Sequence, residues 1–136
     1  MTRCWGDDMA KFIKSETIAE PLDQMFSEYY RDSRERMEKA TTQTGRECAK
    51  ELKSDSPKRT GKYASGWGAE NTTVTFGGPS TTVWNKKYPG LTHLLEYGHV
   101  NRGGTGRTPA HPHIKRVEQE MNEKYYQRMK EAGEDK

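Results

Sequence analysis

The sequence is poor in apolar residues for its length. Hydrophobic side chains make up 30% of its 136 residues, and its 13 glycines raise the apolar share to about 40%, below the roughly 45–50% of a typical globular domain. The mean hydropathy is -1.18. A chain of this length forms one small core rather than two, and we expect parts of it to gain order only in an assembly.

Cysteine and long apolar runs are also scarce. Cys4 and Cys48 lie far apart, without the Cys-x-x-Cys or Cys/His spacing of a zinc site. No hydrophobic run approaches the roughly 20 residues that a membrane span needs, and the first residues lack the apolar core of a signal peptide. We therefore expect a reduced cytoplasmic setting and no contact with a membrane.

Charge is nearly balanced, with 23 Lys and Arg against 20 Asp and Glu, and the two signs are interleaved along most of the chain. The segment from Asn85 to Arg116 is the exception. Its single acid is Glu96, against the cations Lys86, Lys87, Arg102, Arg107, Lys115 and Arg116. This bias permits contact with an acidic partner or with DNA, and requires neither.

The N-terminal part of the sequence predicts one long amphipathic helix. Thr17 to Glu20 has the spacing of a capping box and Pro21 suits a first turn, so the helix is predicted to begin between residues 17 and 21. Pro57 ends it, because the residue before a proline avoids the helical region. Apolar or small residues recur in steps of three and four: Ile18, Leu22, Met25, Tyr29, Ser33, Met37, Ala40, Thr44, Cys48 and Leu52.

This stripe has two interpretations. We favour a helix that faces the protein's own core, because the small residues Ser33, Thr44 and Cys48 suit close packing on a sheet. Cys48 is then a small buried hydrophobe, since no positive neighbour lowers its pKa. The alternative is an oligomer seam, although the small residues dilute the pattern of a coiled coil.

The middle of the sequence predicts strands. An alternating segment follows a basic turn, with Tyr63, Ser65, Trp67 and Ala69 on one side, and strands at residues 72–76 and 81–86 flank the turn Gly77 to Ser80. Pairing across this turn sets Val74 opposite Val83 and Phe76 opposite Thr81, and places Val74, Phe76 and Val83 on one face. Trp84 then lies on the other face, where it either covers earlier segments or is an exposed anchor for a neighbouring subunit.

Two more helices are predicted after the strands. Leu91 to Tyr97 forms a short helix with Leu91, Leu94 and Leu95 turned inward. The last helix begins at His111 or Pro112, ends before Gly133 and carries the stripe Ile114, Val117, Met121, Tyr125 and Met129.

These elements predict an α+β fold, in which a long N-terminal helix and a C-terminal helix pack on a small antiparallel sheet of three to four strands. The expected domain spans residues 17–132. An extended or disordered segment, residues 1–16, precedes it, and a charged tail, residues 133–136, follows it.

The basic, glycine-rich stretch Gly98 to Ala110 is predicted to be a long loop. Such loops are uncommon in compact domains, and are usually either functional or disordered until a partner binds. Gly103 to Arg107 resembles a phosphate cradle only superficially, because it lacks the Gly-Lys-Ser/Thr motif and the preceding strand. We expect this loop to face a partner.

No catalytic residue, cofactor or metal is predicted. A metal-dependent hydrolase is the weakest alternative; it would use His93, Glu96, His99, His111 and His113, whose spacings match no zinc motif. No Ser/His/Asp set with a local signature is present. A nucleic-acid-binding protein is the other alternative, because of the basic central segment.

Two motif blocks carry a resemblance that extends over residues 9–126. In the first, Thr60, Gly61, Lys62 and Ser65 form a Thr-Gly-basic-x-x-Ser turn. In the second, Leu95 to Gly98 form a Leu-Glu-aromatic-Gly block, and Pro109 to Ile114 form a Pro-x-Pro-hydrophobic segment through His111, Pro112 and His113. With the long first helix, they resemble the head-tail joining or tail completion family of tailed bacteriophages and prophages, typified by the tenth gene product of a lambdoid phage. The chain departs from the family in its glycine- and arginine-rich loop and its additional N-terminal residues.

The resemblance implies a non-enzymatic virion protein of the neck. It would form a ring of six copies between the connector or head-completion protein and the tail tube or tail terminator protein. DNA would pass through this ring without sequence-specific binding, and the protein would occupy the host cytoplasm during assembly.

Rings close through heterologous contacts, so each subunit needs two different patches. We predict one patch around Trp84, Lys86 and Lys87, and another on the loop with His99, Arg102 and Arg107; the alternative is that these charges are merely solvated. Among the motif residues, Gly61 and Gly98 are predicted to allow tight turns and Glu96 to cap a helix or to pair with a basic neighbour. Thr60 and Pro112 belong to the same structural motif.

Overall fold

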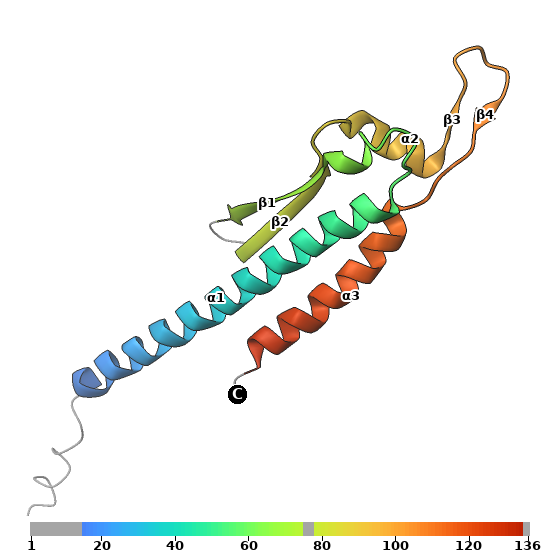
Figure 1. Cartoon of the computed structure of the whole chain (residues 1–136). Coiled ribbons are helices and arrows are strands. Elements are labelled where there is room, and N and C mark those ends of the chain that lie inside the picture. The colour runs from blue at the N-terminus through green and yellow to red at the C-terminus, as the bar shows by residue number, and fades with distance from the viewer. Residues whose placement is uncertain (1–14, 75–77, 135–136) are drawn as a thin grey trace, which may run out of the picture. The chain divides into compact units, whose positions relative to one another are not determined.

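Helix α1 is the longest element of the structure and runs from Ser15 to Asp55 (Figure 1). The structure is a computed structural model that describes residues 15–74 and 78–134, with the side chains of all of these except 15–18, 73 and 74. The helix begins two residues before the predicted range, so Pro21 lies inside it rather than in its first turn. The predicted segment 1–16 lies almost wholly outside the described residues.

The chain divides into two compact units, residues 1–33 and residues 34–136, and the boundary falls within α1. In the first unit, the large apolar side chains Leu22, Met25, Phe26, Tyr29 and Tyr30 are exposed. The interpretation of α1 as a core-facing helix is therefore wrong for this part. Within the described residues, the apolar stripe of this part of α1 is exposed rather than packed in a core.

The second unit holds the core. Its elements are the remainder of α1, strands β1 (Trp67–Val74) and β2 (Gly78–Asn85), helix α2 (Thr92–Tyr97), strands β3 (His99–Val100) and β4 (Arg107–Thr108), and helix α3 (Ile114–Gly133). One 3-10 turn precedes β1 (Ala64–Gly66) and another precedes α2 (Pro89–Leu91). The buried cluster consists of Leu52, Tyr63, Trp67, Val117 and Met121, with Cys48, Val83, Leu95 and Ile114 packed against it. The α+β class is confirmed, with two two-stranded sheets in place of one.

Helix α3 lies beside the second half of α1 (Figure 1). The Arg128 guanidinium donates to the Thr44 hydroxyl at 2.9 Å and to both carboxylate oxygens of Glu47 at 2.8 and 2.9 Å. The predicted stripe of α3 is confirmed, because Val117 and Met121 are buried and Ile114, Tyr125 and Met129 are half-buried.

The β1–β2 hairpin packs on α1 with a register that differs from the predicted one. Ala69 pairs with Val83, and Val74 pairs with Gly78. Val74 is therefore not opposite Val83, and Phe76 lies outside the described residues. Val83 packs against the core while Trp84 is exposed, so these two residues do occupy opposite faces.

A close approach fixes this hairpin on the helix. A Cβ on Gly45 of α1 would lie 2.2 Å from Cγ2 of Thr81, so the contact requires glycine. Thr81 also donates to the Thr41 carbonyl and to Asn71 Oδ1, and Asn71 in turn donates to the Thr42 hydroxyl.

Two local expectations are wrong. The segment before β1 does not alternate as a strand, because a 3-10 turn at Ala64–Gly66 buries both Tyr63 and Trp67 and exposes Ser65. Leu91, predicted to turn inward in the short helix, is exposed and lies in the 3-10 turn before α2.

The stretch Gly98 to Ala110 has structure of its own, contrary to expectation. Strands β3 and β4 pair antiparallel, His99 with Thr108 and Val100 with Arg107. A turn closes them through backbone bonds from Asn101 to Gly106 and from Gly104 to Asn101, and the Thr108 hydroxyl donates to Asn101 Oδ1. This hairpin projects beyond α2 (Figure 1).

Candidate interaction sites

The buried carboxylate of Glu96 caps helix α3 from helix α2. Its oxygens accept hydrogen bonds from the backbone N–H groups of His113 at 2.8 Å, Ile114 at 2.9 Å and Lys115 at 3.0 Å. The residue before α3 supplies no side-chain cap, so Glu96 satisfies donors that would otherwise lack partners at this helix start.

The environment of Glu96 has opposing effects on its pKa. Burial raises the pKa of the Glu96 carboxyl, while the three backbone hydrogen bonds lower it and prevail, so its pKa lies below the ordinary value. The group is therefore held as a carboxylate by the start of α3.

A polar network continues from this cap. His113 donates from Nδ1 to the His111 carbonyl at 2.7 Å, and its Nε2 lies 3.0 Å from the Tyr63 hydroxyl. Burial, and to a lesser degree the charge of Glu96, raise the pKa of Tyr63 to about 12. Trp67 packs edge-on against Tyr63 and donates from Nε1 to the Ser56 hydroxyl at 2.7 Å. The two motif blocks thus meet in the core.

Asn85 is a structural residue that the sequence patterns did not single out. It is 1% exposed, donates to the Tyr63 carbonyl at 2.9 Å and accepts from the backbone of Lys87 and Tyr88 at 3.2 and 2.9 Å. A Cβ on Gly66 would lie 2.2 Å from Asn85 Oδ1. The sequence pattern that could have identified it is an asparagine at the end of a strand and before a turn, where the side chain can accept hydrogen bonds from the backbone that follows.

The predicted motif residues have different environments. Gly98 has φ +71, and a Cβ there would lie 2.5 Å from the Thr108 carbonyl oxygen, so glycine is required at the base of the β3–β4 hairpin. Gly61 has φ +68 with open space around it. Thr60 and Pro112 are exposed.

The five residues of the metal-hydrolase alternative do not assemble. Among the described residues, no group of three or more His, Cys, Asp or Glu side chains is placed to hold a metal ion. Glu96 and His113 do lie together, with Nδ1 3.3 Å from Oε2, but three backbone N–H groups already occupy that carboxylate. His99 lies in β3, while His93 and His111 are exposed.

The residues of one predicted patch lie at the end of β2 and directly after it, and those of the other lie on the β3–β4 hairpin. Trp84 is 41% exposed on the outer face of β2, with Lys86 Nζ 5.9 Å from the centroid of its ring. Lys87 Nζ donates to the Ser65 hydroxyl at 3.0 Å. Arg102 and Arg107 are exposed on the β3–β4 hairpin, and His99 is half-buried there.

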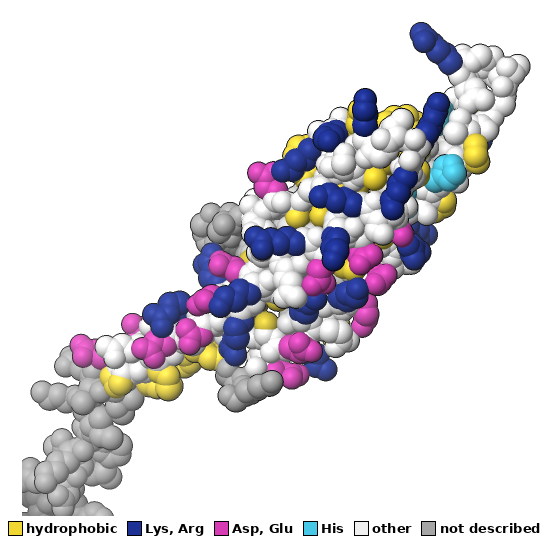
Figure 2. Space-filling model, in the orientation of Figure 1, with side chains coloured by type: hydrophobic (Ala, Val, Ile, Leu, Met, Phe, Trp, Pro, Cys, Tyr) yellow, Lys and Arg dark blue, Asp and Glu magenta, His cyan; other side chains and the backbone are white. Residues whose placement is uncertain are grey.

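Cations dominate the surface of this region, as Figure 2 shows for the part that carries the hairpins and α2. Residues 58–116 contain nine Lys and Arg against two acids, Glu70 and the buried Glu96. Within the described residues, Arg116 alone of the nine forms an ion pair, with Asp55. The other eight are Lys58, Arg59, Lys62, Lys86, Lys87, Arg102, Arg107 and Lys115.

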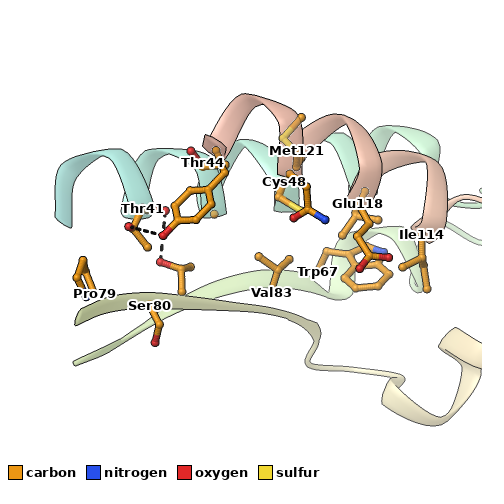
Figure 3. A pocket seen from close by; sticks show the side chains of 15 residues that line it. Thr41, Thr44, Cys48, Trp67, Pro79, Ser80, Val83, Ile114, Glu118 and Met121 are labelled. Atoms are coloured by element: carbon orange, nitrogen blue, oxygen red, sulfur yellow. Dashed lines mark hydrogen bonds between the residues drawn. The ribbon is translucent and has the colours of Figure 1, made fainter. Parts of the chain in front are cut away.

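An apolar groove lies between β2, the second half of α1 and α3 (Figure 3). Its volume is about 600 Å³. Cys48, Leu52, Val83, Ile114 and Met121 line its apolar part, and hydroxyl groups from α1 and β2 line one end. Burial raises the pKa of the Cys48 thiol, in agreement with its predicted role as a small packing residue.

The fold and these sites define a small α+β protein whose motif residues join its helices and hairpins. A family model, HK97-gp10-like, with the description "Bacteriophage HK97-gp10, putative tail-component", matches residues 20–98, which are 79 of the 136 residues. The chain belongs to this family of bacteriophage tail components. Comparisons with curated proteins and with solved structures gave no match. No helix among the described residues has the length and apolar character to cross a membrane.

Proposed function

We propose that the protein is a non-enzymatic subunit of a ring at the phage neck, which completes the tail and joins it to the DNA-filled head. The observation that carries this proposal is the match of residues 20–98 to a family of phage tail components. The connector or head-completion protein and the tail tube or tail terminator protein are the partners expected on its two sides.

The described surface offers two chemically different patches, as this role requires. A ring closes through heterologous contacts, which need two chemically different patches on each subunit. The first unit exposes an apolar helix face, and the second exposes cations with the aromatic side chain of Trp84. Six copies and a central passage for DNA are part of the proposal.

A knockout of the gene in a phage or prophage that encodes this protein tests the role. Electron microscopy of the lysate is expected to show filled heads beside unattached tails, and expression of the wild-type chain from a plasmid is expected to restore whole particles. Normal particles in the knockout lysate would refute the proposal.

A further inference from the structure

The first unit carries an apolar helix face that is exposed among the described residues. Leu22, Met25, Phe26, Tyr29 and Tyr30 are 40%, 57%, 55%, 45% and 70% exposed. Their spacing of three and four residues places them on one side of α1. We call this apolar face, together with the acidic residues that flank it within residues 20–32, the acidic stripe.

Acidic residues border the apolar side chains on both sides. Residues 20–32 contain four acids, Glu20, Asp23, Glu28 and Asp32, and one base, Arg31, which gives a net charge of -3. At about 100° per residue, Asp23 lies along one border of the stripe and Glu28 and Asp32 along the other. A partner for this face therefore needs apolar surface together with cations.

The second unit presents such a surface between α1 and β1. A cleft of about 250 Å³ is lined by Arg46, Ala49, Lys50 and Lys53 of α1 and by Gly68 and Ala69 of β1. The Lys86 side chain passes so close to Gly68 that a Cβ there would lie 2.9 Å from Lys86 Cε. We call this cleft, with Lys86 and the neighbouring Trp84, the basic cleft.

No acid in the described part of the chain pairs with the cations of the basic cleft. Within the described residues, Arg46, Lys50, Lys53 and Lys86 form no ion pair, although ion pairs are frequent elsewhere on α1 and α3. Ala49 and Ala69 form the apolar part of the lining of the cleft, and Trp84 adds a large exposed aromatic side chain. The cleft thus combines the features that the acidic stripe needs.

We propose that the acidic stripe of one copy docks on the basic cleft of a second copy. This inference rests on the proposed ring, and it names the two surfaces that meet between neighbouring subunits. The opposite charges attract and set the register, while the apolar side chains supply the buried area. The contact is heterologous, so it repeats from copy to copy, as the contacts between the subunits of a ring do.

Two other occupants fit less well. If the stripe paired with the stripe of another copy, two segments of charge -3 would face each other, and like charges oppose association. Duplex DNA would neutralise the cations of the cleft, but it would leave the apolar side chains of the stripe in water.

Charge reversal tests the contact in the full-length chain. One variant carries Asp23→Lys and Glu28→Lys, a second carries Lys50→Glu and Lys53→Glu, and a third carries all four changes and so keeps the net charge. Sedimentation velocity at low salt measures self-association over a range of concentrations, and circular dichroism confirms the fold of each variant. The control, Glu131→Lys with Glu134→Lys, has the same charge change as the first variant but lies outside both surfaces.

We expect each two-site variant alone to weaken association at least about tenfold, and the control to leave it unchanged. The four-site variant and an equimolar mixture of the two two-site variants are expected to regain part of the association, because the reversed charges of a stripe then face reversed charges of opposite sign in a cleft, while Arg46 and Lys86 leave that cleft with a net charge near zero. A chain that stays monomeric at every concentration, or variants that associate like the wild type, would overturn the contact.

The same set of variants also tests whether the basic cleft binds DNA. If Lys50→Glu with Lys53→Glu abolishes retention of duplex DNA on a filter, while Asp23→Lys with Glu28→Lys leaves self-association unchanged, the cleft is a surface for DNA and the inference fails. If the contact fails but the knockout lysate contains unjoined heads and tails, the proposed function stands without this interface.

Discussion

Glu96 shows how one residue can give a sequence motif its meaning. It is the only acid in the basic segment from Asn85 to Arg116, and it serves the start of α3 from inside the fold instead of facing a partner. The Leu-Glu-aromatic-Gly block and the segment Pro109 to Ile114 therefore form one structural unit, in which the first caps the helix that follows the second. Their separation in sequence corresponds to the β3–β4 hairpin between them.

Replacing Glu96 with Gln is expected to destabilise the protein. The amide keeps an oxygen acceptor but loses the charge that three backbone donors require, which costs about 1–3 kcal/mol of the free energy of unfolding. Urea denaturation followed by tryptophan fluorescence measures the change. The exposed acid Glu131 of α3, the helix that Glu96 caps, is changed to Gln as the matched control. Equal stability of the two variants would contradict the capping role.

The pH dependence of stability follows from the same group. The pKa of Glu96 is lower in the folded state than its ordinary value of 4.5, so its contribution is present above about pH 4.5 and is lost as the pH falls through the folded-state pKa. The difference in unfolding free energy between wild type and Glu96→Gln should stay constant above about pH 5 and shrink below it. Urea titrations at several acidic pH values measure this difference, and a difference that grows in acid would contradict the assignment.

At the scale of elements, periodicity predicted the helices well and the strands less well. The stripe of α3 follows from spacing alone, because a helix buries one side against a neighbour whatever that neighbour is. The register of β1 and β2 did not follow, since the Gly-Gly-Pro segment that suggested a turn has its later residues inside β2. The depth of Asn85 and the contact of Gly45 with Thr81 depend on residues far apart in sequence, which no local pattern reports.

The β3–β4 hairpin provides a paired test of glycine requirement. Gly98 and Gly104 have nearly equal φ values, +71 and +70, but a Cβ on Gly98 would meet the Thr108 and Ala110 backbone while one on Gly104 would meet open space. Gly104→Ala should cost about 1 kcal/mol of strain, and Gly98→Ala clearly more, because backbone must move at the base of the hairpin. Urea denaturation of both variants measures this, and equal costs would show that φ alone matters.

At the scale of the whole molecule, one continuous helix belongs to two units of different character. The sequence predicted the full length of the apolar stripe on α1. It did not predict where burial of this stripe ends, because apolar residues recur with the same spacing whether their own chain or another copy buries them. The scarcity of apolar residues pointed to completion in an assembly. That scarcity did not indicate which part of the stripe is exposed. The exposure of the apolar side chains within residues 20–32 shows that it is this part.

Hydrogen exchange along α1 is expected to report this division. Isolated helices gain little stability from backbone bonds alone, whereas residues 41–52 are also held by the hairpin, by α3 and by the core around Leu52. In the dissociated chain, amides of residues 22–32 should therefore exchange at least about tenfold faster than those of residues 41–52, as mass spectrometry of peptides from each segment can measure. In concentrated samples that self-associate, the first segment should become protected while the second stays as it was. Uniform protection along α1 in the monomer would mean that the apolar side chains of residues 22–30 have cover within their own chain, and would remove the reason for a neighbour to supply it.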